Sequence, residues 1–237
     1  MKWHKKFIAI VSLIAALAAC SSETHYAPVT DIAAIERIPR NGTYHVSSGE
    51  TLYSIAWRYG QDYRYLAKLN HMSPPYHVVS GQRIYLSDKL FSISKNQSKK
   101  IIQNSAPVHV VEREPNTLVL KWNWPASGPL TQGYSQLNKG INIGGHVGTS
   151  IYATAPGIVV YSGNGLRGYG NLIIIKHNSH YLSAYAYNSL VFVREGQRVN
   201  AHQKIAEMGS FNLHQAMLHF ELRKNGQPVN PLNYLKT

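Results

Sequence analysis

Hydrophobic and polar positions between residues 43 and 87 change from an extended spacing to a helical spacing and back again. Residues 44–46 form a short extended run, and residues 83–86 form another. Between these runs, apolar side chains recur on one face of a helix, at Leu52, Ile55, Ala56 and Tyr59. A second apolar group ends at Asn70 and is followed by two prolines, which stop a helix. The pattern predicts a strand–helix–helix–strand module whose first helix is capped by Thr51.

From residue 118 onward, β-branched and aromatic runs alternate with glycine-containing turns, and this pattern predicts a β-rich domain. The runs cover residues 151–153, 157–161, 171–176, 181–185 and 218–222. Residues 163–168 match the G-x-G-x-x-G string of dinucleotide-binding loops. That string holds a pyrophosphate only where a strand leads into a helix. A second strand-like run follows here, so we interpret the string as a hairpin loop and expect no nucleotide.

The N-terminal segment is typical of an exported protein. Lys2, Lys5 and Lys6 precede a mostly apolar run over residues 7–19. The run is shorter than the ~20 residues that a membrane-spanning helix needs, so it predicts a secretory signal. Cys20 follows it and is the only cysteine, which excludes an intramolecular disulfide.

The chain divides into five segments by composition. They are a signal at 1–19, Cys20 with a flexible tether at 20–42, the small module at 43–87, a polar linker at 88–117 and the β-rich domain at 118–237. The predicted fold class is therefore α+β for the small module and mainly antiparallel β for the larger domain.

The charge of the chain favours an anionic partner. The sequence has 24 Lys plus Arg and 11 Asp plus Glu, a formal net charge of +13, and loss of the three signal lysines leaves +10. Such an excess predicts a long-range attraction that salt weakens. Peptidoglycan, with its peptide-stem carboxylates, fits this charge. The sequence has no nucleic-acid-binding motif, and no nucleic-acid partner is expected.

The small module resembles a LysM domain along its whole length. The matching strings lie at residues 44–52, 66–70 and 80–86. The resemblance implies that N-acetylglucosamine chains of peptidoglycan or chitin bind in a shallow groove. It places Gly49, Glu50, Thr51 and Leu52 on one side of that groove and Asn70, Met72 and Pro75 on the other. Two of these residues have an alternative interpretation, in which Leu52 is a core residue and Asn70 only caps a helix.

The β-rich domain resembles the LytM, or M23, family of zinc peptidases. The matching strings lie at residues 138–142, 168–173, 185–187, 218–221 and 228–231. Active members hold zinc through an H-x-x-x-D string and the second histidine of H-x-H, because these side chains supply basic nitrogen and negative charge.

Most of the positions that hold zinc ligands or catalytic histidines in this family carry other residue types here. The ligand positions hold Asn138, Asn142 and His219, and two neutral amides are poor zinc ligands. The positions of the assisting histidines hold Tyr187 and Met217, neither of which is a useful base near pH 7. The resemblance therefore implies a degenerate peptidase domain with no metal, no cofactor and no catalytic residue.

Residues 17–20 resemble a bacterial lipobox, which implies that Cys20 carries lipid; an ordinary signal peptide is the alternative. Ser21 follows instead of an inner-membrane retention aspartate, and this implies the periplasmic face of the outer membrane. The whole arrangement resembles the NlpD-type murein hydrolase activators, particularly over residues 163–177.

That resemblance implies a non-catalytic protein that activates a periplasmic N-acetylmuramoyl-L-alanine amidase for septal wall splitting during cell division. The degenerate groove, with Asn138, Asn142, Tyr187, Met217 and His219, would bind the amidase. A passive tether between wall and outer membrane and an active zinc endopeptidase are the alternatives.

Overall fold

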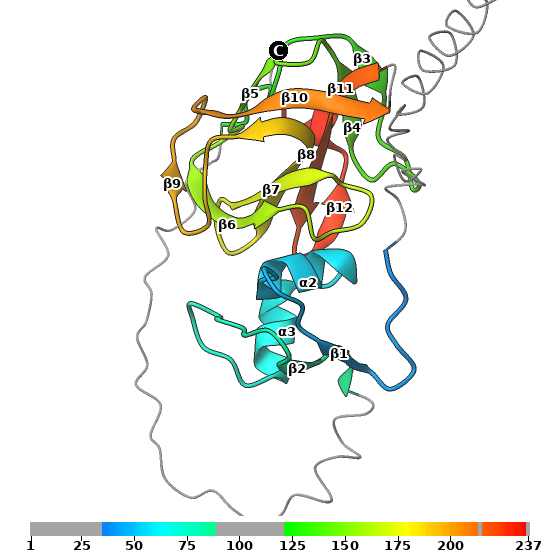
Figure 1. The fold of residues 1–237 in the computed structure, drawn as a ribbon, viewed down its shortest axis with the longest axis vertical. Helices are drawn as coiled ribbons and strands as arrows, with labels where there is room; N and C mark the ends of the chain where they lie inside the picture. Colours follow the sequence, from blue (N-terminus) through cyan, green and yellow to red (C-terminus); the bar gives the residue numbers. More distant parts are fainter. Residues whose placement is uncertain (1–34, 89–120, 213–214, 236–237) are drawn as a thin grey trace, which may run out of the picture.

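The computed structural model describes residues 35–88, 121–212 and 215–235 (Figure 1). The predicted signal, Cys20 and most of the tether and linker lie outside these residues. We call residues 43–87 the small module and residues 121–235 the β-rich domain.

The small module has the predicted order of elements. They are β1 (Thr43–His45), α2 (Leu52–Arg58), α3 (Tyr63–Leu69) and β2 (Arg83–Tyr85), with β1 and β2 paired antiparallel. The Thr51 side chain accepts from the backbone N–H of Ser54, and the Ser54 side chain accepts in return from Thr51 N–H. This reciprocal cap satisfies two donors at the start of α2, which confirms the capping role predicted for Thr51. Leu52, Leu66 and Ile84 are fully buried in its core.

The β-rich domain is built on one antiparallel sheet of ten strands in the order β3-β4-β11-β10-β8-β7-β6-β9, with β12 beside β11 and β5 beside β10 (Figure 1). The strands are β3 (Leu130–Gln132), β4 (Ile141–Gly144), β5 (Ser150–Tyr152), β6 (Gly157–Gly163), β7 (Asn171–Lys176), β8 (Tyr181–Val191), β9 (Arg198–Val199), β10 (Lys204–Asn212), β11 (Gln215–Lys224) and β12 (Gln227–Val229). A short 3-10 helix (Pro231–Asn233) follows. Strands β6 and β7 pair antiparallel around the glycine-rich string, so it is a hairpin loop as predicted.

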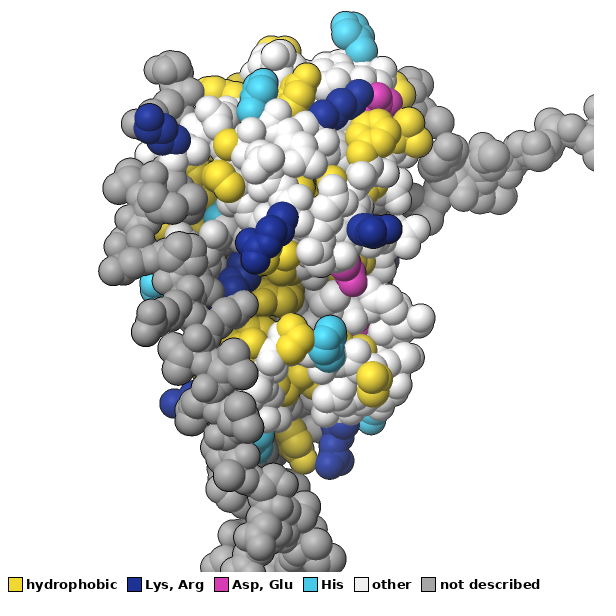
Figure 2. All heavy atoms as spheres, turned by 90° about the vertical axis from the view of Figure 1, so that its left-hand side faces the viewer, with side chains coloured by type: hydrophobic (Ala, Val, Ile, Leu, Met, Phe, Trp, Pro, Cys, Tyr) yellow, Lys and Arg dark blue, Asp and Glu magenta, His cyan; other side chains and the backbone are white. Residues whose placement is uncertain are grey.

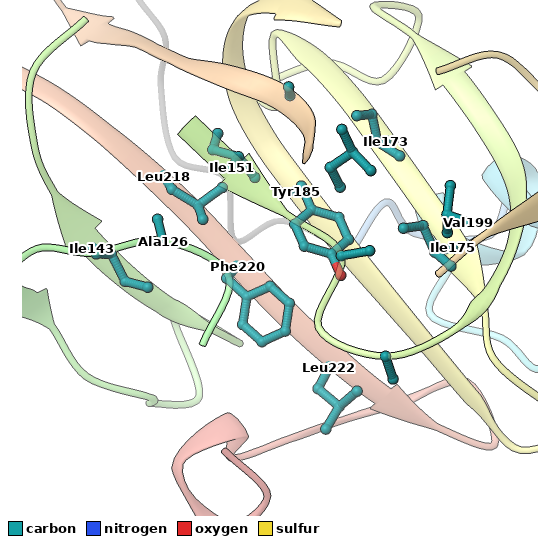
Figure 3. Packing of buried hydrophobic residues seen from close by; sticks show 14 of the residues in the cluster. Ala126, Ile143, Ile151, Ile173, Ile175, Tyr185, Val199, Leu218, Phe220 and Leu222 are labelled. Atoms are coloured by element: carbon teal, nitrogen blue, oxygen red, sulfur yellow. The ribbon is translucent and has the colours of Figure 1, made fainter. Parts of the chain in front are cut away.

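The two faces of the central strands are both buried, against different partners. Alternate residues of β11, Leu218, Phe220 and Leu222, pack with Tyr185 and Ile175 inside the β-rich domain (Figure 3). The residues that alternate with them lie on the opposite face: Met217, His219, Glu221 and Arg223.

The small module covers part of that opposite face. A second apolar cluster joins Trp57 of α2 to side chains of β7 and β8, among them Leu172, Ile174 and Ala184. The Thr51 hydroxyl also donates to the carbonyl of Val160 on β6, at 3.0 Å. Figure 1 shows α2 seated directly below the sheet. The module and the domain therefore share a continuous core, a contact that the sequence alone does not predict.

His177, just after β7, gives the β-rich domain a pH-dependent stability. Its Nδ1 lies 2.8 Å from the carbonyl of Pro156 and its Nε2 lies 2.7 Å from the Ser183 hydroxyl. Burial lowers the pKa of His177 from 6.5 to about 4. In the unfolded chain the His177 ring is protonated below pH 6.5, whereas in the folded chain it is protonated only below about pH 4. Stability is full above pH 6.5 and falls as the pH drops through this window.

We expect the free energy of unfolding to fall by about 2 kcal/mol across that window because of His177, with partial exposure of the ring reducing the effect. Urea denaturation of His177→Asn, compared with wild type at pH 7 and pH 4, measures this loss. The exposed His146 provides a control, since His146→Asn should retain the wild-type pH dependence. A His177→Asn variant with an unchanged pH dependence would contradict the assignment.

Candidate functional site

The candidate site centres on His219, which lies in β11 directly opposite Asn142 of β4. The ring Nδ1 of His219 donates to the amide oxygen of Asn142 at 2.6 Å. The ring Nε2 lies 3.2 Å from a carboxylate oxygen of Glu221. His219 is completely buried, and Asn142 is 5% exposed. The structure thus brings these two predicted site residues into direct contact.

Asn138 is held by its own loop. Its side-chain amide nitrogen donates to the carbonyls of Gly133 and Gly140, at 3.0 and 2.9 Å. The next residue, Lys139, has a φ of 54°, which turns the chain into β4. Asn138 is 6% exposed and lies in the segment that leads into the strand carrying Asn142. Its amide therefore stabilises that turn.

Tyr187 reaches the same face through an irregularity in β8. Its φ is 66°, and the pairing of β8 with β7 and β10 shifts register around it. A non-glycine residue in this region costs about 1 kcal/mol or more, which the surrounding sheet must offset. The phenol ring lies 6.3 Å from the His219 ring, measured between centroids. Met217, two residues before His219 in β11, completes the predicted set, and both side chains are nearly inaccessible at 4% and 5%.

The donor set does not fit a zinc ion. Both ring nitrogens of His219 already face hydrogen-bond acceptors, the Asn142 amide oxygen at Nδ1 and the Glu221 carboxylate at Nε2, so neither is directed at an open position where a metal could bind. The Asn138 side chain offers only a neutral amide oxygen, which is a poor zinc ligand, and its amide nitrogen is fixed by two carbonyls. Burial, and then the charge of Glu221, raises the pKa of Tyr187, so its phenol stays protonated near neutral pH. Across the described ranges, 35–88, 121–212 and 215–235, no three His, Cys, Asp or Glu side chains are grouped as metal ligands.

A buried polar network links this site to the small module. Glu221 accepts from the Tyr169 hydroxyl at 2.7 Å and from Arg223 at 3.0 Å. Arg223 Nη1 donates to the backbone carbonyl of Trp57 at 2.9 Å, and its guanidinium lies 3.6 Å from the Trp57 ring centroid. The Trp57 indole N–H in turn donates to the Tyr169 hydroxyl at 3.3 Å. We call Trp57, Tyr169, His219, Glu221 and Arg223 the interdomain network.

The carboxylate at the centre of this network is ionised. Burial alone would raise the pKa of Glu221, but the charge of Arg223 and the hydrogen bonds from His219 and Tyr169 outweigh it and lower the pKa to about 2. A buried ion pair of this kind is held by its partners on both sides, and one of those partners belongs to α2. Trp57 and Arg223 therefore fix the small module on the sheet.

Sequence reasoning missed Trp57, Tyr169, Glu221 and Arg223. A signal for two of them was present in β11, where His219, Glu221 and Arg223 alternate with apolar residues. That alternation is typical of a strand with one face in water. The small module covers this face instead, and the polar side chains satisfy one another.

The predicted sugar-binding residues divide into structural and accessible groups. Leu52 is fully buried, and Asn70 bonds the backbone of Leu66 and Tyr85, which supports the alternative interpretation of these two. Glu50 is 7% exposed. Its carboxylate accepts from Tyr44, from the backbone N–H of Ser47 and from Arg58.

The remaining sugar-binding candidates reach the surface. Gly49 is exposed with a φ of 75°, a conformation that favours glycine. Thr51 and Met72 are half-buried, and Pro75 is exposed. In the part of the chain that the structure describes, no helix has the length and apolar character needed to cross a membrane.

Comparisons with known proteins match both parts of the chain. Peptidase family M23 matches residues 136–231, and the LysM domain matches residues 44–87. A lipoprotein NlpD/LppB homolog of Pseudomonas aeruginosa is 40% identical over 238 residues, covering 86% of this chain and 80% of the relative. Murein hydrolase activator NlpD of Salmonella dublin is 37% identical over 255 residues, covering 81% and 68%. The structure of Helicobacter pylori Csd3 is 27% identical with a TM-score of 0.45, covering 49% of this chain and 33% of that one.

Proposed function

Because the chain belongs to the NlpD family of lipoproteins that join a LysM domain to an M23 domain, we propose that it activates a periplasmic N-acetylmuramoyl-L-alanine amidase. The relatives from Salmonella dublin and Escherichia coli are named murein hydrolase activators. In this proposal the chain binds peptidoglycan through its small module and cuts no bond itself. The partner enzyme splits septal wall during cell division.

The observation that carries the proposal is the hydrogen bond between His219 and Asn142. It joins two of the positions at which an M23 peptidase would hold its metal. Because these two side chains bond each other, the site supports binding of a partner protein better than zinc-dependent hydrolysis of peptidoglycan.

The surface around the site supports a protein partner. Large apolar side chains are exposed on segments that flank it, with Leu130 on β3, Leu137 beside Asn138 and Val147 just after β4. Their exposed fractions are 45%, 77% and 63%. Apolar groups exposed on neighbouring segments mark an interaction site where a partner covers them together, as the amidase would in this proposal. We propose that the amidase contacts this rim, and that the nearly inaccessible Asn138, Asn142, Tyr187, Met217 and His219 form the floor of the site beneath it.

The relatives that are named lipoproteins also support a place in the cell envelope. We propose that Cys20 carries the lipid and that Ser21 directs the protein to the periplasmic side of the outer membrane. A basic chain anchored there would lie close to the anionic peptidoglycan.

Release of labelled peptidoglycan tests the proposed function. The protein that begins at Ser21 is incubated alone, alone with a chelator, and together with the organism's periplasmic amidase. We expect release only when amidase and this chain are both present, and no stoichiometric zinc in the purified chain. Chelator-sensitive release by this chain alone would contradict the proposal and support an endopeptidase. Wall binding without any activation would support a passive tether.

A further inference from the structure

A cavity of about 320 Å³ lies where the small module meets the β-rich domain. Thr51, Tyr53 and Pro75 line it from the small module, and Ile158, Val160 and Lys176 line it from β6 and β7. Ligand cavities are frequent at domain interfaces because two surfaces together make a concave site that neither makes alone. Figure 2 shows hydrophobic side chains, with lysine or arginine beside them, between the upper and lower parts of the molecule on this side.

The cavity continues the sugar groove implied for the small module. Thr51 and Pro75 come from the two opposite sides of that groove, and both line the cavity. The Thr51 hydroxyl lies at the seam, since it donates to the carbonyl of Val160. The second wall of the groove is therefore a strand of the β-rich domain.

The chemistry of the two walls suits a chain of N-acetylated sugars. Tyr53 and the half-buried Ile158 and Val160 offer apolar surface of the kind that packs against sugar rings and acetamide methyl groups. Lys176 offers an ammonium group, and Glu195 offers a carboxylate on the same wall. These can bond hydroxyl and amide groups, and Lys176 can also bond the carboxylate of a peptide stem.

The interdomain network holds the two walls in place. Arg223 bonds the backbone at the end of α2, and Thr51 stands at the start of the same helix. The helix is thus fixed against the sheet near both ends. A groove whose walls are already positioned loses less conformational freedom when a ligand binds.

We propose that the small module and the β-rich domain form one composite glycan-binding cleft, in which β6 and Lys176 contact a strand of N-acetylated sugars together with the LysM residues. The proposal rests on glycan binding as part of the proposed function. It goes beyond that function by assigning a sugar-binding wall to the β-rich domain, separate from the degenerate peptidase site.

The test uses a double variant that carries both Ile158→Asn and Lys176→Ala. The control is the single variant Lys121→Ala. Lys121 is exposed and does not line the cavity, so its variant removes one positive charge from the β-rich domain without changing the cleft. Affinity is measured by calorimetry for a peptidoglycan tetrasaccharide with peptide stems and for a chitin tetrasaccharide. We expect the double variant to bind about tenfold more weakly than the control, as loss of a charged hydrogen bond and apolar contact implies.

The two ligands distinguish the source of recognition. Weaker binding of both would assign the cleft to the sugars, and weaker binding of the stem-bearing ligand alone would assign Lys176 to a stem carboxylate. Equal affinities of the double variant and Lys121→Ala for both ligands would overturn the proposal. Amidase activation on a soluble substrate is measured separately with the same proteins, so failure of the proposed function would appear in wild type and leave the binding comparison intact.

Discussion

The free energy of unfolding of an Arg223→Met variant is expected to be about 3–5 kcal/mol lower than that of wild type, because the substitution leaves the carboxylate of Glu221 buried without its cation. Arg223 is 1% exposed and Glu221 is fully buried, so water cannot replace the lost partner. The variant also loses the contact with the Trp57 ring and carbonyl. Urea denaturation followed by circular dichroism measures the change.

The double variant Glu221→Leu with Arg223→Met provides the control for this prediction. Removing both charges eliminates the uncompensated carboxylate, so we expect at least about 2 kcal/mol of the loss to return. If the single variant cost less than about 1 kcal/mol, the interdomain network would not have the buried character described above.

Amidase activation is expected to fall at least tenfold when Tyr187 and Met217 are both replaced by alanine. Both side chains lie in the floor of the site, so their loss reshapes the surface that the amidase would contact. A loss of about 2 kcal/mol of binding energy corresponds to roughly a thirtyfold change in affinity. Peptidoglycan binding should stay within about twofold of wild type, since both residues lie outside the cavity at the domain interface. The release assay and a wall-pelleting assay measure the two effects.

Both side chains are nearly buried, so their loss also destabilises the fold, and a matched control is needed. Leu222 lies in the same strand but points to the opposite face, into the core of the β-rich domain. Leu222→Ala should cost about 2–5 kcal/mol of stability and retain activation at a temperature where it is folded. Equal loss of activation in both variants would show that stability, and not partner contact, is responsible.

The architecture was largely predictable from the sequence because local patterns determine it. The helical spacing from Leu52 to Tyr59 and the β-branched runs at 157–161 and 171–176 each match an element of the structure. Less regular segments were not identified as strands, including β10, where glycine and charged residues interrupt the apolar pattern. Pairing with β5, β8 and β11 supplies what the sequence of β10 does not.

The contact between the two domains was not predictable for a different reason. Trp57 reads as one more apolar residue of α2, and Arg223 reads as a charge near the exposed end of a strand. Their pairing depends on 165 intervening residues folding so that both meet, and no local pattern records it. The candidate site shows the same limit, since its residue types were visible in the sequence but the bond between Asn142 and His219 was not.

The fixed position of α2 on the sheet has a consequence for the effective concentration of the amidase near its substrate. A glycan strand in the cleft and an amidase at the candidate site around His219 would be bound to one rigid body. The second encounter then becomes intramolecular, with an effective concentration that geometry sets, in the millimolar range typical of short tethers. If α2 were held less firmly, the effective concentration of the enzyme around its substrate would fall, and glycan binding would weaken because the two walls of the cleft would no longer be positioned together.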